Sequence, residues 1–259
     1  MKYVTSYEQA VSPSTKLIYG SLLKADMLVL VKNRRSVVLS ILLPMVILFT
    51  THGNKAQQRL GGSLILVGLA ITYGLMSTSM LGYTLAVARD RDAGVFQRLR
   101  VTPAPTWMII TSRLAIQVVA NLVIALLVVI VGASMYHLTL SPGQYVMVLA
   151  ISILGGALFL SIGLALVGML KSSDTVNAAG RIVFAALIFL GLFGISGALG
   201  GALQFIASWS PVGTVMDLFS AAINPARWTS HDSLSLLVTL AYIVCFAAVG
   251  IRWFRWDTH

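Results

Sequence analysis

The stretch RDRDAGVFQRLRVTP, from Arg89 to Pro103, lies between two long uncharged segments and indicates the fold class. Its 15 residues include four arginines and two aspartates. The segment before it, Leu60 to Ala88, contains no Lys, Arg, Asp or Glu, and neither does the segment from Leu114 to Leu170. A soluble domain disperses its charge, whereas a membrane protein concentrates charge in the loops between apolar spans. The pattern predicts that Arg89–Pro103 is an aqueous loop.

The composition agrees with an all-α integral membrane protein. The chain is 58% hydrophobic and 10% charged, with a mean hydropathy of +0.89, whereas a globular domain carries about a quarter charged residues. A spanning helix needs about 20 mostly apolar residues. Six segments reach or approach that length, and we predict spans at Ser36–Asn54, at Leu60–Ala88, on either side of the Ser141–Gly143 turn within Leu114–Leu170, at Gly180–Gly201 and at Ser233–Ile251.

Two further segments are predicted to touch the membrane without crossing it. Ala202–Ala222 is apolar but is interrupted around Pro211, so we expect short re-entrant helices on the outer side. Near the N-terminus, six apolar residues fall near helical spacing and predict an amphipathic helix on the membrane surface; the alternative is an unstructured basic leader. The six are Leu17, Ile18, Leu22, Met27, Leu28 and Val31. The predicted organisation is therefore a segment 1–35, a transmembrane domain 36–252 and a tail 253–259.

The basic residues predict the orientation of the spans. Of 18 Lys and Arg, 15 fall in the termini, the Arg89 region and the fourth connection. Basic residues are concentrated in cytoplasmic loops, so we expect a cell-membrane protein with both termini in the cytoplasm. The net charge of +10 then reflects topology and contact with anionic lipids, and it does not imply nucleic acid.

The chain offers little catalytic chemistry of its own. It has no G-x-x-x-x-G-K-[ST] phosphate loop, and its four histidines are scattered without a zinc-binding pattern. We therefore expect no metal or cofactor on this chain. No carboxylate maps to mid-membrane, which argues against coupling to an ion gradient. A transporter with this sequence would take its energy from another protein.

One motif suggests a different activity. Gly194-Ile195-Ser196-Gly197 matches the G-x-S-G motif of rhomboid-type intramembrane serine proteases. A serine nucleophile needs a base within hydrogen-bond reach, and Ser233–Ile251 contains no histidine. Close packing of a glycine-rich helix explains the motif better.

The Arg89 loop has the features of a docking element. Val95, Phe96 and Leu99 recur at helical spacing within a short helix predicted from Asp90 to Arg100, and arginines surround them. An apolar face ringed by arginine suits a groove on an acidic partner; the alternative is a solvated loop that only fixes topology.

This loop resembles the signature of ABC transporter type-2 (ABC-2) permeases, in which a charged, glycine-containing helix leads to Leu-x-x-Thr-Pro. The resemblance implies a homodimer or heterodimer of six-span subunits that docks two separate ATPase subunits, which bind ATP and Mg. The implied coupling residues are Asp90, Arg91, Gly94, Val95, Phe96, Leu99, Arg100, Thr102 and Pro103. The chain departs from the family where it has Asp90 or Asp92 in place of Glu, Val95 in place of Thr and Gln97 in place of Glu.

Within the family, the region Lys24–Pro44 resembles exporters of drugs and natural products, which predicts export of a hydrophobic or amphipathic compound such as a drug or lipid. Export of lipid-linked glycans is an alternative, as is a membrane anchor that recruits an ATPase without transporting anything. Polar and soft side chains in the second and fifth spans are candidates for the substrate pathway, with ordinary helix packing as the other interpretation. These candidates are Thr72, Tyr73, Met76, Ser77, Thr78, Met80, Asn177 and Phe184.

Overall fold

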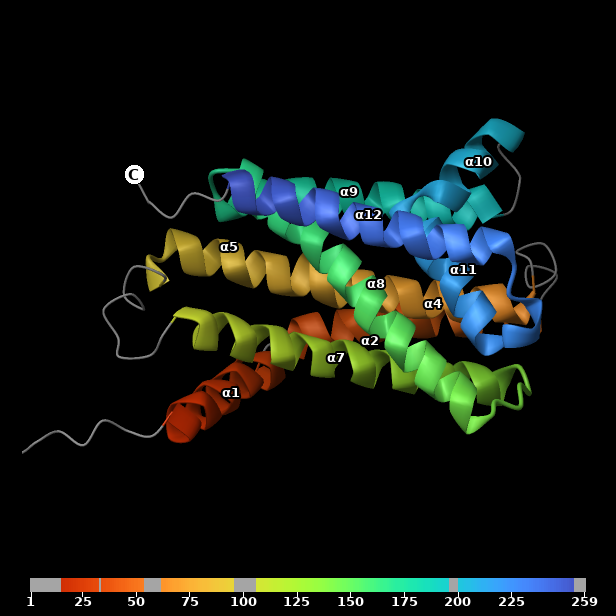
Figure 1. Cartoon of the computed structure of the whole chain (residues 1–259), viewed down its shortest axis with the longest axis horizontal. Helices are drawn as coiled ribbons and strands as arrows, with labels where there is room; N and C mark the ends of the chain where they lie inside the picture. The colour runs from red at the N-terminus through yellow and green to blue at the C-terminus, as the bar shows by residue number, and fades with distance from the viewer. Residues whose placement is uncertain (1–14, 33, 54–61, 96–105, 196–199, 254–259) are drawn as a thin grey trace, which may run out of the picture.

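The computed structural model describes residues 15–32, 34–53, 62–95, 106–195 and 200–253, which form helices and turns with no strand among them. The long helices lie side by side along one axis (Figure 1). Five are long and apolar enough to cross a membrane, and the count rises to six if one bent pair forms a single span. The all-α membrane class is confirmed, and the predicted number of six spans stays a prediction.

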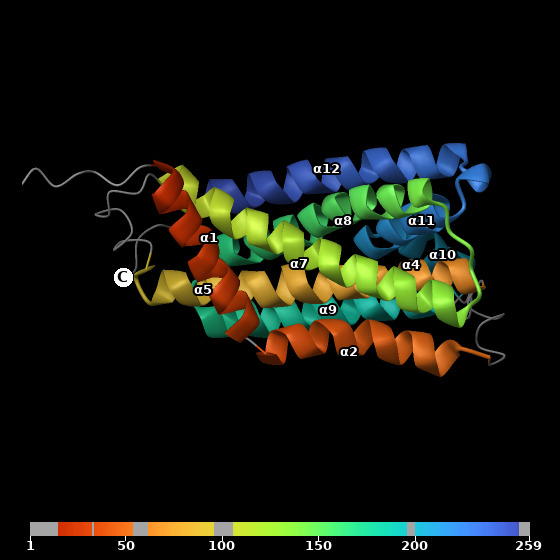
Figure 2. The same ribbon diagram turned by 90° about the horizontal axis from the view of Figure 1, so that it is seen from below.

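The first two helices are α1 (Thr15–Lys32) and α2 (Arg34–Thr51). α1 lies obliquely against α7 at one end of the bundle (Figure 2) and carries exposed apolar side chains such as Leu17 and Val29. The six residues that predicted a helix lie within α1, while its amphipathic character and its contact with lipid stay predictions. α2 corresponds to the first predicted span, and Pro44 lies within it.

The second span is the centre of the bundle. It consists of α4 (Ser63–Met76), the π-helix η1 (Ser77–Tyr83) and α5 (Thr84–Asp92). The most apolar part of this span is 83% buried inside the single chain. A π-helix closes i→i+5 hydrogen bonds and is rare, so seven consecutive π-helical residues mark a special position in the span. The span ends at Asp92, beyond the predicted end at Ala88.

The Ser141–Gly143 turn separates α7 (Thr106–Met135) from α8 (Pro142–Met169), as predicted. Ser141 Oγ accepts a hydrogen bond from Gln144 N at 3.4 Å, and Gln144 Oε1 accepts one from Ser141 N at 2.5 Å. This reciprocal cap, with Pro142 at the first helical position, starts α8 at a defined residue.

The remaining helices are α9 (Ser173–Ile195), α10 (Gly201–Trp209), α11 (Pro211–Ile223), the single 3-10 turn η2 (Pro225–Arg227) and α12 (Ser230–Trp253). α9 begins before the predicted Gly180. Ser210 Oγ caps α11 by accepting from Gly213 N at 3.1 Å, and α10 and α11 are bent by 75° at this point. The predicted interruption of Ala202–Ala222 is therefore confirmed.

α8 and α12 pack so closely that a Cβ atom at Gly168 would lie 2.7 Å from the Gly250 carbonyl oxygen. Glycine allows this approach because two backbones can meet without side chains between them. The core of the bundle contains large fully buried side chains, including Tyr73, Phe159 and Phe219.

Candidate functional site

The candidate coupling residues that the structure describes, Asp90, Arg91, Gly94 and Val95, lie at the end of the bundle where α5 finishes and where α7 and α9 begin, which we call the charged end (Figure 1). Asp90 and Arg91 occupy the last turn of α5. Gly94 follows with a φ of +67°, a conformation that favours glycine and interrupts the helix. The short helix predicted from Asp90 to Arg100 therefore does not begin at Asp90. Val95 is half-buried, and Phe96, Leu99, Arg100, Thr102 and Pro103 lie outside the described residues.

Asp90 joins α5 to two other helices. Its Oδ2 accepts a hydrogen bond from Arg113 Nη1 at 2.6 Å. Arg113, on α7, also lies 3.9 Å from Asp26 Oδ1 on α1, and Ser112 Oγ donates to Asp26 Oδ2 at 2.5 Å. One arginine thus holds two carboxylates from helices far apart in the sequence. These charges connect α1, α5 and α7 at the base of the loop.

Arg91 is buried, although it lies in the last turn of a helix beside a loop, where an arginine is usually exposed. Its guanidinium donates to the carbonyl oxygens of Val167 at 2.5 Å, Leu170 at 2.9 Å and Lys171 at 2.9 Å. These carbonyls belong to the C-terminal end of α8, where the helix itself supplies no donors. Arg91 therefore caps α8 from a neighbouring helix, and its positive charge suits that end of the helix dipole.

Asp92 makes the third connection. Its Oδ2 accepts a hydrogen bond from the backbone N of Ser173 at 2.6 Å, at the first residue of α9. A carboxylate at a helix N-terminus satisfies an unpaired N–H and favours the helix dipole. Three consecutive residues, Asp90 to Asp92, thus tie the end of the second span to α1, α7, α8 and α9. A displacement of this turn would act on all four helices.

The candidate pathway residues of the second span are all buried inside the chain, and these are Thr72, Tyr73, Met76, Ser77, Thr78 and Met80. Tyr73 OH donates to the Ile188 carbonyl oxygen on α9 at 2.7 Å, and Thr72 Oγ1 donates to the Gly68 carbonyl oxygen at 2.7 Å. Phe184 packs against the same core, and half-buried Asn177 lies nearer the charged end. These contacts assign the residues a packing role, and a role in the pathway stays a prediction.

Sequence reasoning missed a buried polar cluster that holds η1. Thr78 Oγ1 donates to Asn121 Oδ1 at 2.8 Å, and Asn121 Nδ2 donates to Ser79 Oγ at 3.0 Å. Gln117 Nε2, one turn before Asn121 on α7, lies 3.2 Å from Ser79 Oγ and 3.1 Å from Asn121 Oδ1. The signal in the sequence was a Gln and an Asn at i, i+4 within an otherwise apolar segment.

Two glycines of α8 bring that helix against this region. A Cβ atom at Gly156 would overlap the Asn121 amide, and one at Gly163 would overlap the Thr84 hydroxyl. Thr84 Oγ1 in turn donates to the Ser79 carbonyl oxygen at 3.2 Å, inside η1. The irregular backbone of the second span is therefore held by side chains of α7 on one side and by the bare backbone of α8 on the other.

Replacing Asn121 with leucine, which is similar in size, is expected to destabilise the chain. The change leaves hydroxyls of η1 with fewer partners, and an unpaired buried polar group costs about 1–3 kcal/mol. Thermal unfolding of the purified chain in detergent would show a lower midpoint. Val123→Ala, at an exposed position on the same helix, is the control. An unchanged midpoint for Asn121→Leu would contradict the role assigned to the cluster.

The proposed serine nucleophile, Ser196, lies outside the described residues, as do its neighbours to residue 199. His231 has its Nδ1 3.8 Å from Asp217 Oδ2 and packs against Trp209 with a ring-centroid distance of 4.8 Å. Gly194 packs against Ala207, where a Cβ atom would overlap the alanine methyl group. These contacts support the packing interpretation of the glycine-rich segment.

Comparison with known proteins agrees with this architecture. Residues 19–224 match the model of the family described as ABC-2 type transporter. The chain is also 23% identical over 238 residues to YvfS of Bacillus subtilis (strain 168), which is named as a transport permease; the match covers 86% of this chain and 91% of YvfS. The family match includes α2, the complete second span and the Arg89 loop. The chain therefore belongs to the ABC-2 type transporter family.

Proposed function

We propose that this transporter permease subunit is the membrane part of an ATP-driven exporter, powered by two separate ATPase subunits that dock on the loop between α5 and α7. The observation that carries the proposal is the turn Asp90–Asp92, whose side chains contact α7, α8 and α9 directly and are linked to α1 through Arg113. A push on the loop would reach α1, α7, α8 and α9 together, because each is tied to the same turn by hydrogen bonds or ion pairs.

The loop itself supplies the docking surface in this proposal. Arg91 is engaged in capping α8, so contact with the ATPase falls to the segment from Val95 to Pro103. Its apolar residues and arginines suit a groove on an acidic surface. The charged end is then cytoplasmic, both termini lie on that side of the cell membrane, and a second copy or a related permease completes a dimer.

The cargo in this proposal is a hydrophobic or amphipathic compound such as a drug, a lipid or a natural product. The described spans are apolar, and their interior has polar side chains but no carboxylate between the two ends of the bundle. Such an interior suits an uncharged or amphipathic cargo. Lipid-linked glycans would use the same kind of path, and transport assays with both cargo classes distinguish them.

The double variant Leu99→Asp with Arg100→Glu is expected to insert normally, to lose co-purification of the ATPase and to lose export. The changes place negative charge on an apolar position and reverse an arginine at a surface expected to meet acidic groups. Co-purification from detergent and export from intact cells measure the two effects. Arg252→Glu, an exposed charge reversal at the end of α12, is the control. Unchanged export with unchanged co-purification would remove the loop from the proposal.

A membrane anchor that only recruits an ATPase would also lose co-purification in that variant. The Asn121→Leu variant separates the two functions, because it alters the centre of the second span and leaves the loop intact. If the chain is an exporter, this variant loses transport while the ATPase still co-purifies with it. If the chain is only an anchor, the ATPase still co-purifies and any export measured in the cells is unchanged.

A further inference from the structure

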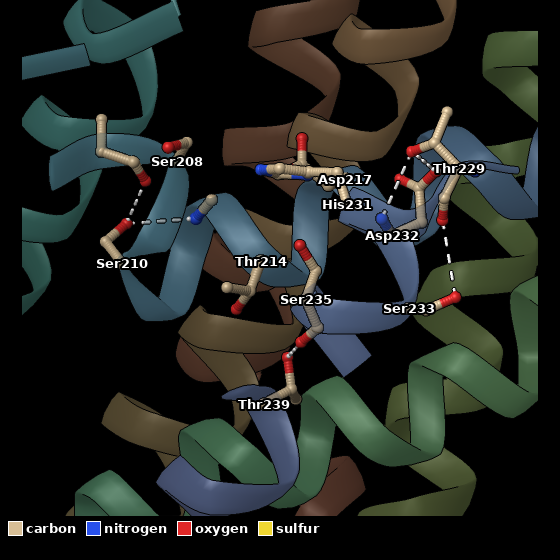
Figure 3. Close-up of polar contacts among 12 residues, drawn as sticks. Ser208, Ser210, Thr214, Asp217, Thr229, His231, Asp232, Ser233, Ser235 and Thr239 are labelled. Atoms are coloured by element: carbon tan, nitrogen blue, oxygen red, sulfur yellow. Dashed lines mark hydrogen bonds and ion pairs between the residues drawn. The ribbon is translucent and has the colours of Figure 1, made fainter. Parts of the chain in front are cut away.

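At the end of the bundle opposite the charged end, α11 and the first turns of α12 bring a carboxylate, an imidazole and a hydroxyl together. Asp217 Oδ2 lies 3.8 Å from His231 Nδ1, which suits an ion pair and is too long for a hydrogen bond. Ser235 follows His231 by one helical turn, and Figure 3 shows its hydroxyl pointing toward the Asp217 and His231 side chains. We call these three residues the far-end cluster.

Two side-chain atoms of the far-end cluster lack a hydrogen-bond partner. Asp217 Oδ2 and Ser235 Oγ are the buried side-chain polar atoms without a hydrogen bond in the described part of the chain. Ser235 is 0% exposed. Its neighbour Thr239 is satisfied, since Thr239 Oγ1 donates to the Ser235 carbonyl oxygen at 2.7 Å. Buried polar groups are nearly always paired, so an unpaired carboxylate oxygen favours an occupant that donates a hydrogen.

The surrounding charges point to a proton as that occupant. α4, α8 and α10 contain no Lys, Arg, Asp, Glu or His, and the ionisable residues of α9 are at the charged end. Among the described side chains, Asp217 therefore faces His231 and one further acid, Asp232. Asp232 Oδ2 is occupied, because it accepts from both N and Oγ1 of Thr229 at 2.7 Å. Asp217 therefore has one imidazole beside it and a second negative charge nearby, and a proton on the His231–Asp217 pair offsets the repulsion between the two carboxylates.

A metal ion suits the site less well. No group of three His, Cys, Asp or Glu side chains with metal-binding geometry occurs among the described residues. Zinc sites in proteins use at least three protein ligands, and the far-end cluster offers one imidazole and one carboxylate with a free oxygen.

The far-end cluster also connects α10 and α11, the pair of helices bent at Ser210, to the last helix, α12. The His231 ring packs against the indole of Trp209, with ring centroids 4.8 Å apart. Tyr242 OH, on α12, donates to the Trp209 carbonyl oxygen at 2.9 Å. α10 contacts α12 through Trp209, and α11 contacts it through Asp217. The charge of His231 therefore acts on both halves of the bent pair.

We propose that the far-end cluster is a proton-binding site, in which a proton taken from water by His231 Nδ1 and shared with Asp217 fastens α10 and α11 to α12. With the proton bound, imidazolium and carboxylate attract each other across the 3.8 Å gap. When the proton leaves to water, the carboxylate loses the neighbouring positive charge and faces Asp232 without compensation. The contact between α11 and α12 is then weaker, so acidity on that side of the membrane sets how firmly the bent pair is held.

Trp209 provides a direct measurement of this site, since a protonated imidazole stacked on an indole quenches its fluorescence. The full-length chain would be purified in detergent and its tryptophan emission followed from pH 8 to pH 5, the range in which imidazoles usually change charge. Emission is expected to fall as the pH is lowered. The fall is expected to vanish in Trp209→Phe, which removes the reporter from among the five tryptophans, and in His231→Gln.

The shared proton is tested by Asp217→Asn, which removes the negative charge and keeps the shape. The midpoint of quenching is expected to move to lower pH, because the imidazolium loses the carboxylate beside it. Asp174→Asn, the same substitution at the charged end, is expected to leave the midpoint unchanged. An Asp217→Asn chain with the wild-type midpoint would overturn the proposal. The proposal would also be overturned if the Trp209 emission of the wild-type chain did not change between pH 8 and pH 5.

Discussion

Replacing Arg91 with methionine is expected to abolish transport and to lower the melting temperature of the chain, while insertion in the membrane is retained. Methionine fills much of the same space but donates no hydrogen bond. The carbonyls of Val167, Leu170 and Lys171 then lose their shared donor. A hydrogen bond to a charged group contributes about 1.5–3 kcal/mol, so losing this group of three should cost at least that amount. Thermal unfolding in detergent and export from cells measure the two effects.

The controls for this prediction come from the same turn and the same charge. Arg89 is exposed, so Arg89→Met should leave both measurements near wild type. Arg91→Lys keeps the charge, but a single ammonium group cannot reproduce the planar fork of the guanidinium, and partial recovery is expected. A melting temperature and transport rate equal to wild type in Arg91→Met would show that the end of α8 does not depend on this residue.

Gly163→Ala is expected to have the second large effect. A methyl group at Gly163 would overlap the Thr84 hydroxyl at the junction of η1 and α5, and overpacking in a tight core costs about 1–3 kcal/mol. The midpoint of thermal unfolding should fall and transport should fall with it, because α8 must move away from the second span.

Gly143→Ala on the same helix is the matched control for this change. The nearest atom to a Cβ there is Ser141 Oγ at 3.9 Å, and alanine is favoured over glycine in an open helical position by about 0.5–1 kcal/mol. The two alanine variants should therefore shift the unfolding midpoint in opposite directions. Adding Thr84→Ala to Gly163→Ala should restore part of the loss. Equal midpoints for both glycine variants would contradict the close contact.

Most of the helical architecture could be predicted from the sequence, because apolar segments of spanning length and local turn chemistry indicate where the helices lie. The Ser141–Gly143 turn and the interruption at Ser210–Pro211 were readable as caps and prolines. The fifth span was predicted from Gly180, whereas α9 begins at Ser173, because an apolar pattern does not show how far a helix continues beyond the apolar segment through residues such as Asp174. The same reasoning ended the second span at Ala88, four residues before its end at Asp92.

The candidate site was predicted less completely, because its contacts join residues that are distant in the sequence. Periodicity within Arg89–Pro103 cannot show that Arg91 points inward onto α8, some 76 residues later. It also cannot show that Asp26 and Asp90 share Arg113. Gln117 and Asn121 were visible as polar residues in an apolar segment, but their partner is a π-helix, which no local pattern predicts. The Val95–Pro103 docking surface stays a prediction.

The π-helix η1 also decides which way the turn Asp90–Asp92 faces. Successive residues of an α-helix are separated by about 100° around the axis, and each residue accommodated by π-type hydrogen bonding shifts the following helix by roughly that angle. With regular α-helix from Ser63 onward, Arg91 would point away from α8 and Asp92 away from α9. The direction in which the turn Asp90–Asp92 faces is therefore set by the irregular segment near the middle of the span, and a one-residue insertion or deletion within η1 would rotate the contacts that this turn makes at the charged end.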